Sequence, residues 1–144
     1  MKPYLLDVNV LIALGWPSHL HHDQAQRWFS RRRAAGFRTC PLTQTGFVRI
    51  SSNPSFTPDA VTPPEALALL DRITTMPGHE FWPDDLPLRK ALGEDSKIAG
   101  HRQIIDYYLL GLATARRGKL ATFDRAVLSL AEPASEVVEL VQGL

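Results

Sequence analysis

Short apolar runs, each followed by a segment with helical spacing, recur along this chain, and this alternation constrains its fold more than any other feature. The first run, at residues 3–6, ends at Asp7, and residues 8–14 then continue with the spacing of a helix. Strands separated by helices favour a parallel sheet covered on both faces, because neighbouring parallel strands need crossover connections. The sequence therefore predicts an α/β fold.

The same pattern predicts five strands and seven helices. Strands are expected over residues 3–6, 37–40, 79–82, 120–123 and 136–141. Helices are expected over residues 8–14, 22–35, 42–50, 66–73, 86–92, 104–116 and 125–130. The segment Thr62-Pro63-Pro64-Glu65 is typical of a helix start, since it combines an N-cap threonine, a proline in the first turn and a glutamate three residues after the cap. Residues 93–100 are expected to form a polar connection.

Length and composition limit the other possibilities. A chain of 144 residues fits one domain, so residues 1–144 are expected to form a single unit. Sixteen basic and fifteen acidic side chains give a net charge of +1, which neither requires nor excludes nucleic acid. The one cysteine, Cys40, cannot form an intrachain disulfide and is expected to be buried in a reducing compartment. No secretory signal or membrane-spanning run is visible, which favours a cytoplasmic protein.

Two aspartates occupy equivalent places in the strand–helix pattern. Asp7 and Asp124 each follow an apolar run directly and precede a helix. In a parallel sheet both are expected at the carboxyl edge, where open α/β sheets bind ligands. Either one can also serve simply as the cap of the helix that follows.

A third aspartate, Asp106, is the only charged residue between Gln103 and Ala115. A helix that is apolar around most of its circumference is largely buried, and a carboxylate there is costly unless it is hydrogen-bonded, paired or bound to a metal. The alternative is a first-turn charge that interacts favourably with the helix dipole.

Three carboxylates without a matching set of histidine and cysteine ligands suit a hard cation such as Mg²⁺ or Mn²⁺. Such an ion can orient and help deprotonate a water molecule and can neutralise charge on a phosphoryl oxygen. The reaction class that this pattern indicates is metal-assisted phosphodiester hydrolysis.

Four segments of the chain carry a family resemblance. They are residues 5–12 (LLDVNVLI), 41–49 (PLTQTGFVR), 105–110 (IDYYLL) and 120–124 (LATFD). Together they resemble the successive motifs of PIN-domain ribonucleases, specifically the VapC-type toxins of toxin-antitoxin systems, over nearly the whole chain. The resemblance implies a three-layer α/β/α domain with a central, mainly parallel sheet.

The resemblance also implies an activity. Such a protein is a Mg²⁺- or Mn²⁺-dependent endoribonuclease that cleaves a structured cellular RNA such as tRNA or rRNA, is neutralised by a VapB-type antitoxin and usually forms a homodimer. By position, Asp7, Asp106 and Asp124 match the acidic residues of the metal site. Asn9 and Thr122 match polar residues that orient carboxylates or water beside it.

One position departs from the family pattern, because Gln44 stands where the second motif carries a glutamate. Glutamine has nearly the same shape but no negative charge, so it is expected to weaken metal affinity and any general-base role. Two explanations fit this residue: a natural variant with altered activity, or a substitution introduced to silence a toxic enzyme.

Five arginines are candidates for RNA contacts: Arg31, Arg32, Arg33, Arg116 and Arg117. Both groups fall at the expected ends of helices, and they can touch phosphates without distinguishing bases. The alternative is a solvated helix surface close to a favourable C-terminal dipole.

Other polar clusters have weaker interpretations. His19, His21 and His22 can be a metal site, but without further ligands a solvated turn explains them better. The pair Asp84-Asp85 can contribute acid to the same cleft or cap a helix. The three tryptophans are expected to be packing residues.

Two further functional classes remain open. A glutamine at position 44 is also compatible with a catalytically weak protein of the same fold that binds RNA or antitoxin. Aspartates at strand ends are also typical of phospho-acceptor signalling domains, but no lysine is well placed to meet the phosphoryl group.

Overall fold

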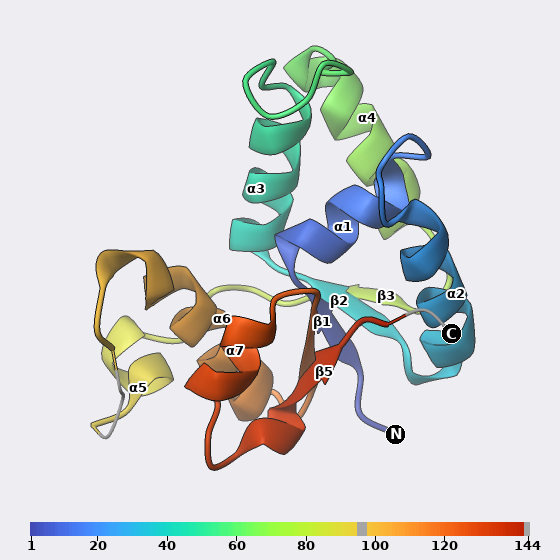
Figure 1. The fold of residues 1–144 in the computed structure, drawn as a ribbon. Coiled ribbons are helices and arrows are strands. Elements are labelled where there is room, and N and C mark those ends of the chain that lie inside the picture. The colour runs from blue at the N-terminus through green and yellow to red at the C-terminus, as the bar shows by residue number, and fades with distance from the viewer. Residues whose placement is uncertain (95–97, 143–144) are drawn as a thin grey trace.

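The computed structural model describes residues 1–94 and 98–142, and it confirms the α/β fold class (Figure 1). Within these residues one parallel sheet has five strands in the order β3-β2-β1-β4-β5. The strands are β1 (Tyr4–Leu6), β2 (Phe37–Thr39), β3 (His79–Phe81), β4 (Lys119–Thr122) and β5 (Val138–Leu140). All five predicted strands are present. The last is shorter than the predicted 136–141, because Ser135–Val137 forms the 3-10 turn η3.

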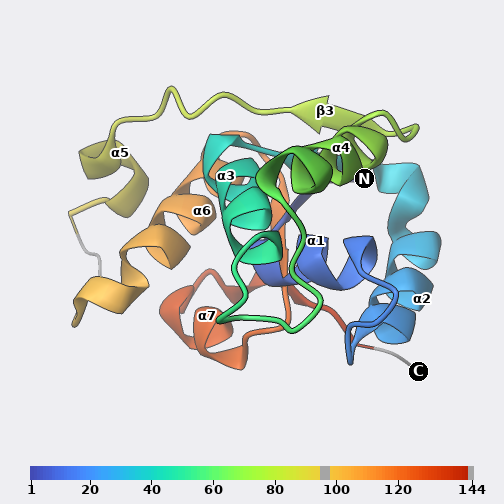
Figure 2. The ribbon, with the colours of Figure 1, turned by 90° about the horizontal axis from the view of Figure 1, so that it is seen from above.

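Seven α-helices connect and flank the strands in the described part of the chain. They are α1 (Val8–Gly15), α2 (His22–Arg32), α3 (Pro41–Ser51), α4 (Pro63–Thr74), α5 (Leu88–Leu92), α6 (Ile104–Ala115) and α7 (Arg125–Leu130). The first four cover one face of the sheet, and α6 and α7 cover the other, with α5 packed on α6 (Figures 1 and 2). None of these helices is long and apolar enough to cross a membrane.

Two apolar cores lie on opposite faces of the sheet, and β1 contributes to both. Leu6 belongs to the core beneath α1 to α4, and Leu5 belongs to the core beneath α6 and α7. Both side chains are fully buried. Successive side chains of a strand point to opposite faces, so a fully apolar strand such as Tyr4–Leu6 is what a central strand covered on both sides requires.

All seven predicted helices are present, and several of their ends differ from the prediction by a few residues. The capping box at α4 is confirmed, since the Glu65 backbone N–H donates to Thr62 Oγ1 and the Glu65 carboxylate accepts from the Thr62 backbone N–H. The predicted helix 22–35 ends earlier, because residues Arg33–Ala35 tighten into the 3-10 turn η1 before Gly36 at φ 82°. Of the predicted polar connection 93–100, residues 95–97 lie outside the described residues.

The order of the strands places a topological switch point between β1 and β4. From β1 the chain adds strands on one side, β2 and then β3, and it then returns to add β4 and β5 on the other side. The two central strands are in register, with Leu6 opposite Ala121. A crevice at the carboxyl ends of two such strands is the usual ligand site of an open α/β sheet.

Helices α1 and α3 approach closely at a glycine. A Cβ atom on Gly46 would lie 2.7 Å from Cγ2 of Val8, a distance at which either the Val8 side chain or one of the two helices must shift. Val8 is the residue directly after Asp7, so this contact lies next to the switch point.

Candidate active site

Three aspartates from three different helix starts converge at the switch point. Asp7 follows β1 as the N-cap of α1, and Asp124 follows β4 as the N-cap of α7. Asp106 lies in the first turn of α6, whose N-terminus comes to the same edge because α6 leads back into the amino end of β4. All three line one open cleft of about 390 Å³. The other residues that line it are Val8, Asn9, Ile12, His19 and Ile50.

Asp7 is held rigidly by two hydrogen bonds. Only 9% of this residue is exposed. Its Oδ1 accepts from the Val8 backbone N–H at 2.8 Å, and its Oδ2 accepts from the Thr122 hydroxyl at 2.7 Å. The carboxylate is therefore fixed in orientation before any ligand binds.

Thr122 connects the polar residues around this carboxylate. Its buried hydroxyl donates to Asp7 and accepts from the Asp124 backbone N–H at 3.1 Å and from Asn9 Nδ2 at 3.3 Å. The Asn9 carbonyl oxygen in turn accepts from the Phe123 backbone N–H. Because Asn9 and Thr122 tie the ends of β1 and β4 together, they set where Asp7 and Asp124 stand relative to one another.

The cleft carries an excess of negative charge. Burial, and then the charges of Asp7 and Asp124, raises the pKa of Asp106 to about 6. Burial raises the pKa of Asp7 as well, against the opposing effect of its hydrogen bonds from Thr122 and Val8. No ion pair within residues 1–94 and 98–142 involves any of the three carboxylates. The positive ends of the helix dipoles offset part of this charge, and a cation in the cleft would offset the rest.

The donor set fits a hard divalent cation. Carboxylate oxygens are the ligands that Mg²⁺ and Mn²⁺ prefer, and Asp106 accepts no hydrogen bond from any described residue, which leaves its oxygens free to coordinate. Within the described ranges no three His, Cys, Asp or Glu side chains are already drawn together as a cage. The aspartates therefore share a cleft, and a bound ion would still have to bring their oxygens together.

Gln44, the residue at the predicted glutamate position, faces a different neighbourhood. Its side-chain amide donates to Thr39 Oγ1 at 2.9 Å, and the same hydroxyl contacts His79 Nε2 at 2.8 Å. Gln44 lines a separate hollow beside Leu67 and Leu70 of α4. The structure does not bring it to the cleft of the three aspartates.

The five arginines predicted to contact RNA lie away from this cleft. Arg31 to Arg33 end the segment that enters β2 at its amino end, so they occupy the opposite edge of the sheet. Arg31 donates to the Gln142 carbonyl, and Arg32 forms an ion pair with Glu139 at 2.7 Å. Arg116 and Arg117 follow the last turn of the twelve-residue α6, about 15 Å along the axis from Asp106.

The smaller predicted clusters separate in the structure. Asp85 forms an ion pair with Arg116 at the far end of α6, and the pair Asp84-Asp85 does not line the cleft. His22 Nδ1 contacts the Ala13 carbonyl, and the His21 ring stacks on Phe123 with centroids 5.2 Å apart. Trp28 and Trp82 are buried in the two cores, as predicted for packing residues.

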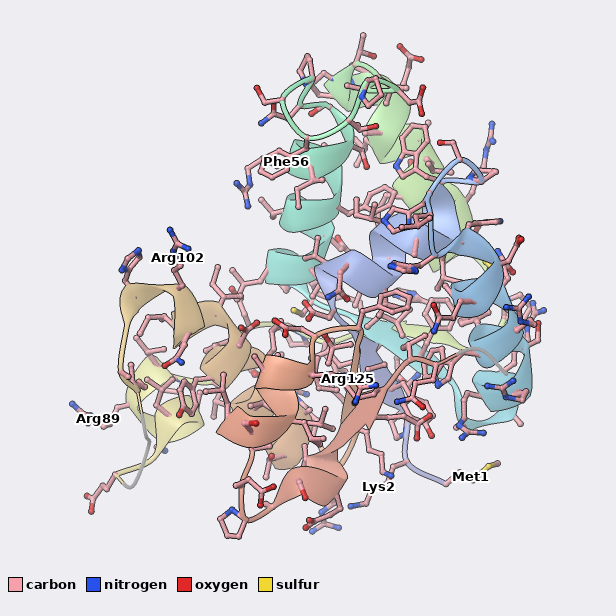
Figure 3. The ribbon with its side chains drawn as sticks, viewed as in Figure 1. Met1, Lys2, Phe56, Arg89, Arg102 and Arg125 are labelled. Atoms are coloured by element: carbon pink, nitrogen blue, oxygen red, sulfur yellow. The ribbon has the colours of Figure 1, made fainter. Side chains whose placement is uncertain are left out.

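Some residues of the cleft were missed at the level of sequence. His19 lines it, although the histidine cluster was interpreted as a solvated turn. The short helix predicted before these histidines was the sequence signal that could have placed His19 near the cleft. An eight-residue α1 is only about 12 Å long, so the turn that follows it stays close to Asp7. Two further exposed arginines are near the aspartates in sequence: Arg125 directly follows Asp124, and Arg102 lies in the turn before α6, where its side chain points outward (Figure 3).

Comparison with known proteins confirms the family resemblance and the fold. Residues 4–133 match the PIN domain family. Ribonuclease VapC39 of Mycobacterium tuberculosis is 49% identical over 124 residues, covering 85% of this chain and 89% of that protein. Ribonuclease VapC38 of the same species is 43% identical over 129 residues, covering 89% of each.

A solved structure shares the fold at low sequence identity. It is the crystal structure of VapBC2 from Rickettsia felis bound to a DNA fragment from their promoter. The TM-score is 0.63 at 14% identity, over 95% of this chain and 97% of the matched chain. With the family match over most of its length and relatives this similar, the chain belongs to the PIN-domain family and, within it, to the VapC ribonucleases.

Proposed function

We propose that this protein is a metal-dependent endoribonuclease toxin that hydrolyses phosphodiester bonds in a structured cellular RNA, such as tRNA or rRNA, in the cytoplasm. The observation that carries the proposal is the group of three aspartates, free of cationic partners among the described residues, at the switch point between β1 and β4. The relatives named as ribonucleases support the activity. The VapC names of the relatives and the VapBC2 structure support a VapB-type antitoxin as the partner, and we extend the proposal to a homodimer of this chain.

Asp7, Asp106 and Asp124 would hold the cation, Mg²⁺ or Mn²⁺. When bound, such an ion neutralises charge on the phosphoryl oxygen and lowers the pKa of a water molecule. The chain itself supplies orientation: Thr122 and the Val8 N–H fix Asp7, and Asn9 braces the loop that carries Asp124. Asp124 is the exposed member, so substrate and water reach the cleft from its side.

A second candidate function follows from Gln44. This residue lacks the charge of the family glutamate, and its amide is engaged with Thr39. A PIN-fold protein with a weakened site that still binds RNA or antitoxin is therefore the alternative to an active nuclease.

The decisive experiment is RNA cleavage by the purified, antitoxin-free protein with Mg²⁺ or Mn²⁺. We expect the protein to cleave and Asp7→Ala to reduce cleavage to the background rate, because the substitution removes an oriented carboxylate from the cleft. We expect Gln44→Glu to change the rate less than about tenfold, since the side chain contacts Thr39 rather than the cleft.

The outcomes separate the two functions. Cleavage that survives Asp7→Ala would contradict the proposed site. No cleavage of tRNA or rRNA by the protein or by Gln44→Glu, together with tight RNA or antitoxin binding, would favour the binding protein. Strong cleavage that appears only in Gln44→Glu would show that position 44 acts in the cleft after all.

The Thr122 hydroxyl offers a test of how Asp7 is positioned. Thr122→Val keeps the shape of the side chain but removes the donor to Asp7 and the acceptor for the Asp124 N–H. We expect Mn²⁺ affinity, measured by calorimetry, and cleavage rate to fall about 10- to 100-fold, the usual effect of losing a group that orients a metal ligand. The matched control is Thr114→Val on the exposed side of α6, which should leave both quantities unchanged. Equal affinities for the two variants would show that Asp7 needs no such support.

A further inference from the structure

A second hollow opens beside the cleft of the three aspartates. It is a pocket of about 340 Å³ at the C-terminal ends of α1 and α3, closed by the loop over residues 53–61. The lining residues that carry the argument are Trp16, Ser18, His19, Phe56 and Asp59. The two hollows share Ile12, His19 and Ile50, so a chain bound across the cleft reaches this pocket without leaving the surface.

The loop that closes the pocket is held in place by backbone hydrogen bonds. The Val61 N–H donates to the Ser51 carbonyl at 3.0 Å, and the Phe56 N–H donates to the Asn53 carbonyl at 3.0 Å. The Asn53 side chain accepts from the Ser55 N–H at 2.9 Å. These bonds hold Phe56 out from the end of α3, where Figure 3 shows it and where 64% of the residue is exposed.

The opposite wall is also fixed. Trp16 Nε1 donates to Ser51 Oγ at 2.9 Å, which holds the half-buried indole against α3. Together with His19, the pocket therefore has three ring-bearing side chains on its walls. Proteins that bind single-stranded nucleic acid use aromatic side chains of this kind as surfaces on which bases stack.

The charge of the pocket selects the kind of group that fits. No lysine or arginine lines the pocket, and Asp59 is its one charged lining residue. The cleft of the three aspartates adjoins it. A phosphate group would be repelled here, whereas a neutral planar ring would not. The Asp59 carboxylate and the Ser18 hydroxyl can accept hydrogen bonds from the N–H groups of such a ring.

We propose that this pocket, the Phe56 pocket, binds one unpaired nucleobase of the RNA adjacent to the scissile phosphate. The proposal rests on the proposed ribonuclease function, since it is the continuity with the aspartate cleft that makes RNA the occupant. Single-stranded RNA is recognised by stacking splayed-out bases on aromatic side chains, and a base inside a duplex is not available for this. Cleavage is thus directed to loops or single strands of the structured substrate.

The test measures binding separately from cleavage. Short single-stranded oligoribonucleotides are titrated in EDTA, and affinity is followed by anisotropy while base stacking is followed by quenching of Trp16 fluorescence, with Trp16→Phe as the optical control. We expect Phe56→Ala to weaken binding about 5- to 100-fold, the range for loss of one stacked base. The control is Leu88→Ala, another exposed apolar residue, on α5. A single abasic nucleotide moved along the oligonucleotide should reproduce the loss at one position only.

The outcomes distinguish this pocket from the proposed activity. If the protein binds with the expected pattern but never cleaves, the ribonuclease proposal fails, and the Phe56 pocket stands as a base-binding site of an RNA-binding protein. If the protein cleaves, and Phe56→Ala binds and cleaves as the original does with no position sensitive to base removal, the base pocket is refuted. Binding without any change in Trp16 fluorescence also refutes it and would leave an apolar side chain of a protein partner as the occupant.

Discussion

Replacing Asp106 with asparagine is expected to lower the rate of RNA cleavage at least about a hundredfold while it raises the stability of the metal-free protein. The loss of activity follows because an amide cannot supply the charge that a hard cation needs. The gain in stability follows because burial and two neighbouring carboxylates raise the pKa of Asp106 to about 6, so its ionised form is held at a cost at neutral pH.

The pH dependence of this gain has a definite sign. As the pH falls, the native protein protonates Asp106 near pH 6, whereas the unfolded chain does so only near pH 4. The cost of the charged carboxylate is therefore complete above pH 6 and is relieved between pH 6 and 4. After allowance for solvent around this half-buried group, we expect Asp106→Asn to be about 1 kcal/mol more stable at pH 7.5 and to lose this advantage at pH 4.

Thermal melting with and without divalent cations tests both the gain in stability and the loss of metal binding. In EDTA at pH 7.5 the variant should melt a few degrees higher, and Mg²⁺ or Mn²⁺ should raise the melting temperature of the original protein more than that of the variant. Asp71→Asn, at an exposed position on α4, is the matched control and should change neither melting nor cleavage. An Asp106→Asn variant that is less stable than the original in EDTA would contradict the electrostatic account of the cleft.

The second large effect concerns stability alone. Phe47→Ala is expected to lower the free energy of unfolding by about 3–5 kcal/mol, because the ring is fully buried between α1 and α3 and its removal leaves a cavity. The whole free energy of unfolding of a domain of this size is only about 5–15 kcal/mol. Urea unfolding should therefore show a midpoint shifted far toward low denaturant.

The chain offers the same substitution at an exposed site. Phe56 is 64% exposed, so Phe56→Ala should leave the urea midpoint close to that of the original protein. A loss of RNA binding in Phe56→Ala then reflects the pocket and not unfolding. Similar destabilisation by both substitutions would show that the loop over residues 53–61 packs more tightly than its exposure indicates.

The aspartate cleft could be predicted because its members follow from rules of topology. Asp7 and Asp124 each stand after a strand and before a helix, and parallel strands bring such positions to one edge. Asp106 could be identified because it is a lone charge on an apolar helix. The reverse holds for Arg31 and Arg116, which stand at the end of a helix and before a strand. Such positions lie at the amino edge of a parallel sheet, opposite the aspartates.

The Phe56 pocket and the position of Gln44 could not be predicted in this way. Trp16 and Phe56 are forty residues apart, and the loop between α3 and α4 that joins them to one pocket has no periodic pattern. Gln44 lies one helical turn into α3, so its neighbourhood depends on the rotation of that helix about its axis, which sequence spacing alone does not fix. Tertiary packing determines both the formation of the pocket and the surroundings of Gln44.

The shape of the cleft depends on the packing of Gly46 as well as on its polar residues. The side chain missing at this position lets α3 rest on Val8, and Val8 is itself one wall of the cleft, between Asp7 and Asn9. Any residue larger than glycine must displace either the Val8 side chain or the helix that carries it. The shape of the cleft wall next to Asp7 therefore depends on a missing methyl group that belongs to none of the hydrogen bonds around the carboxylates. Evolution or design could therefore tune this site by steric bulk on α3 without touching a single charged group.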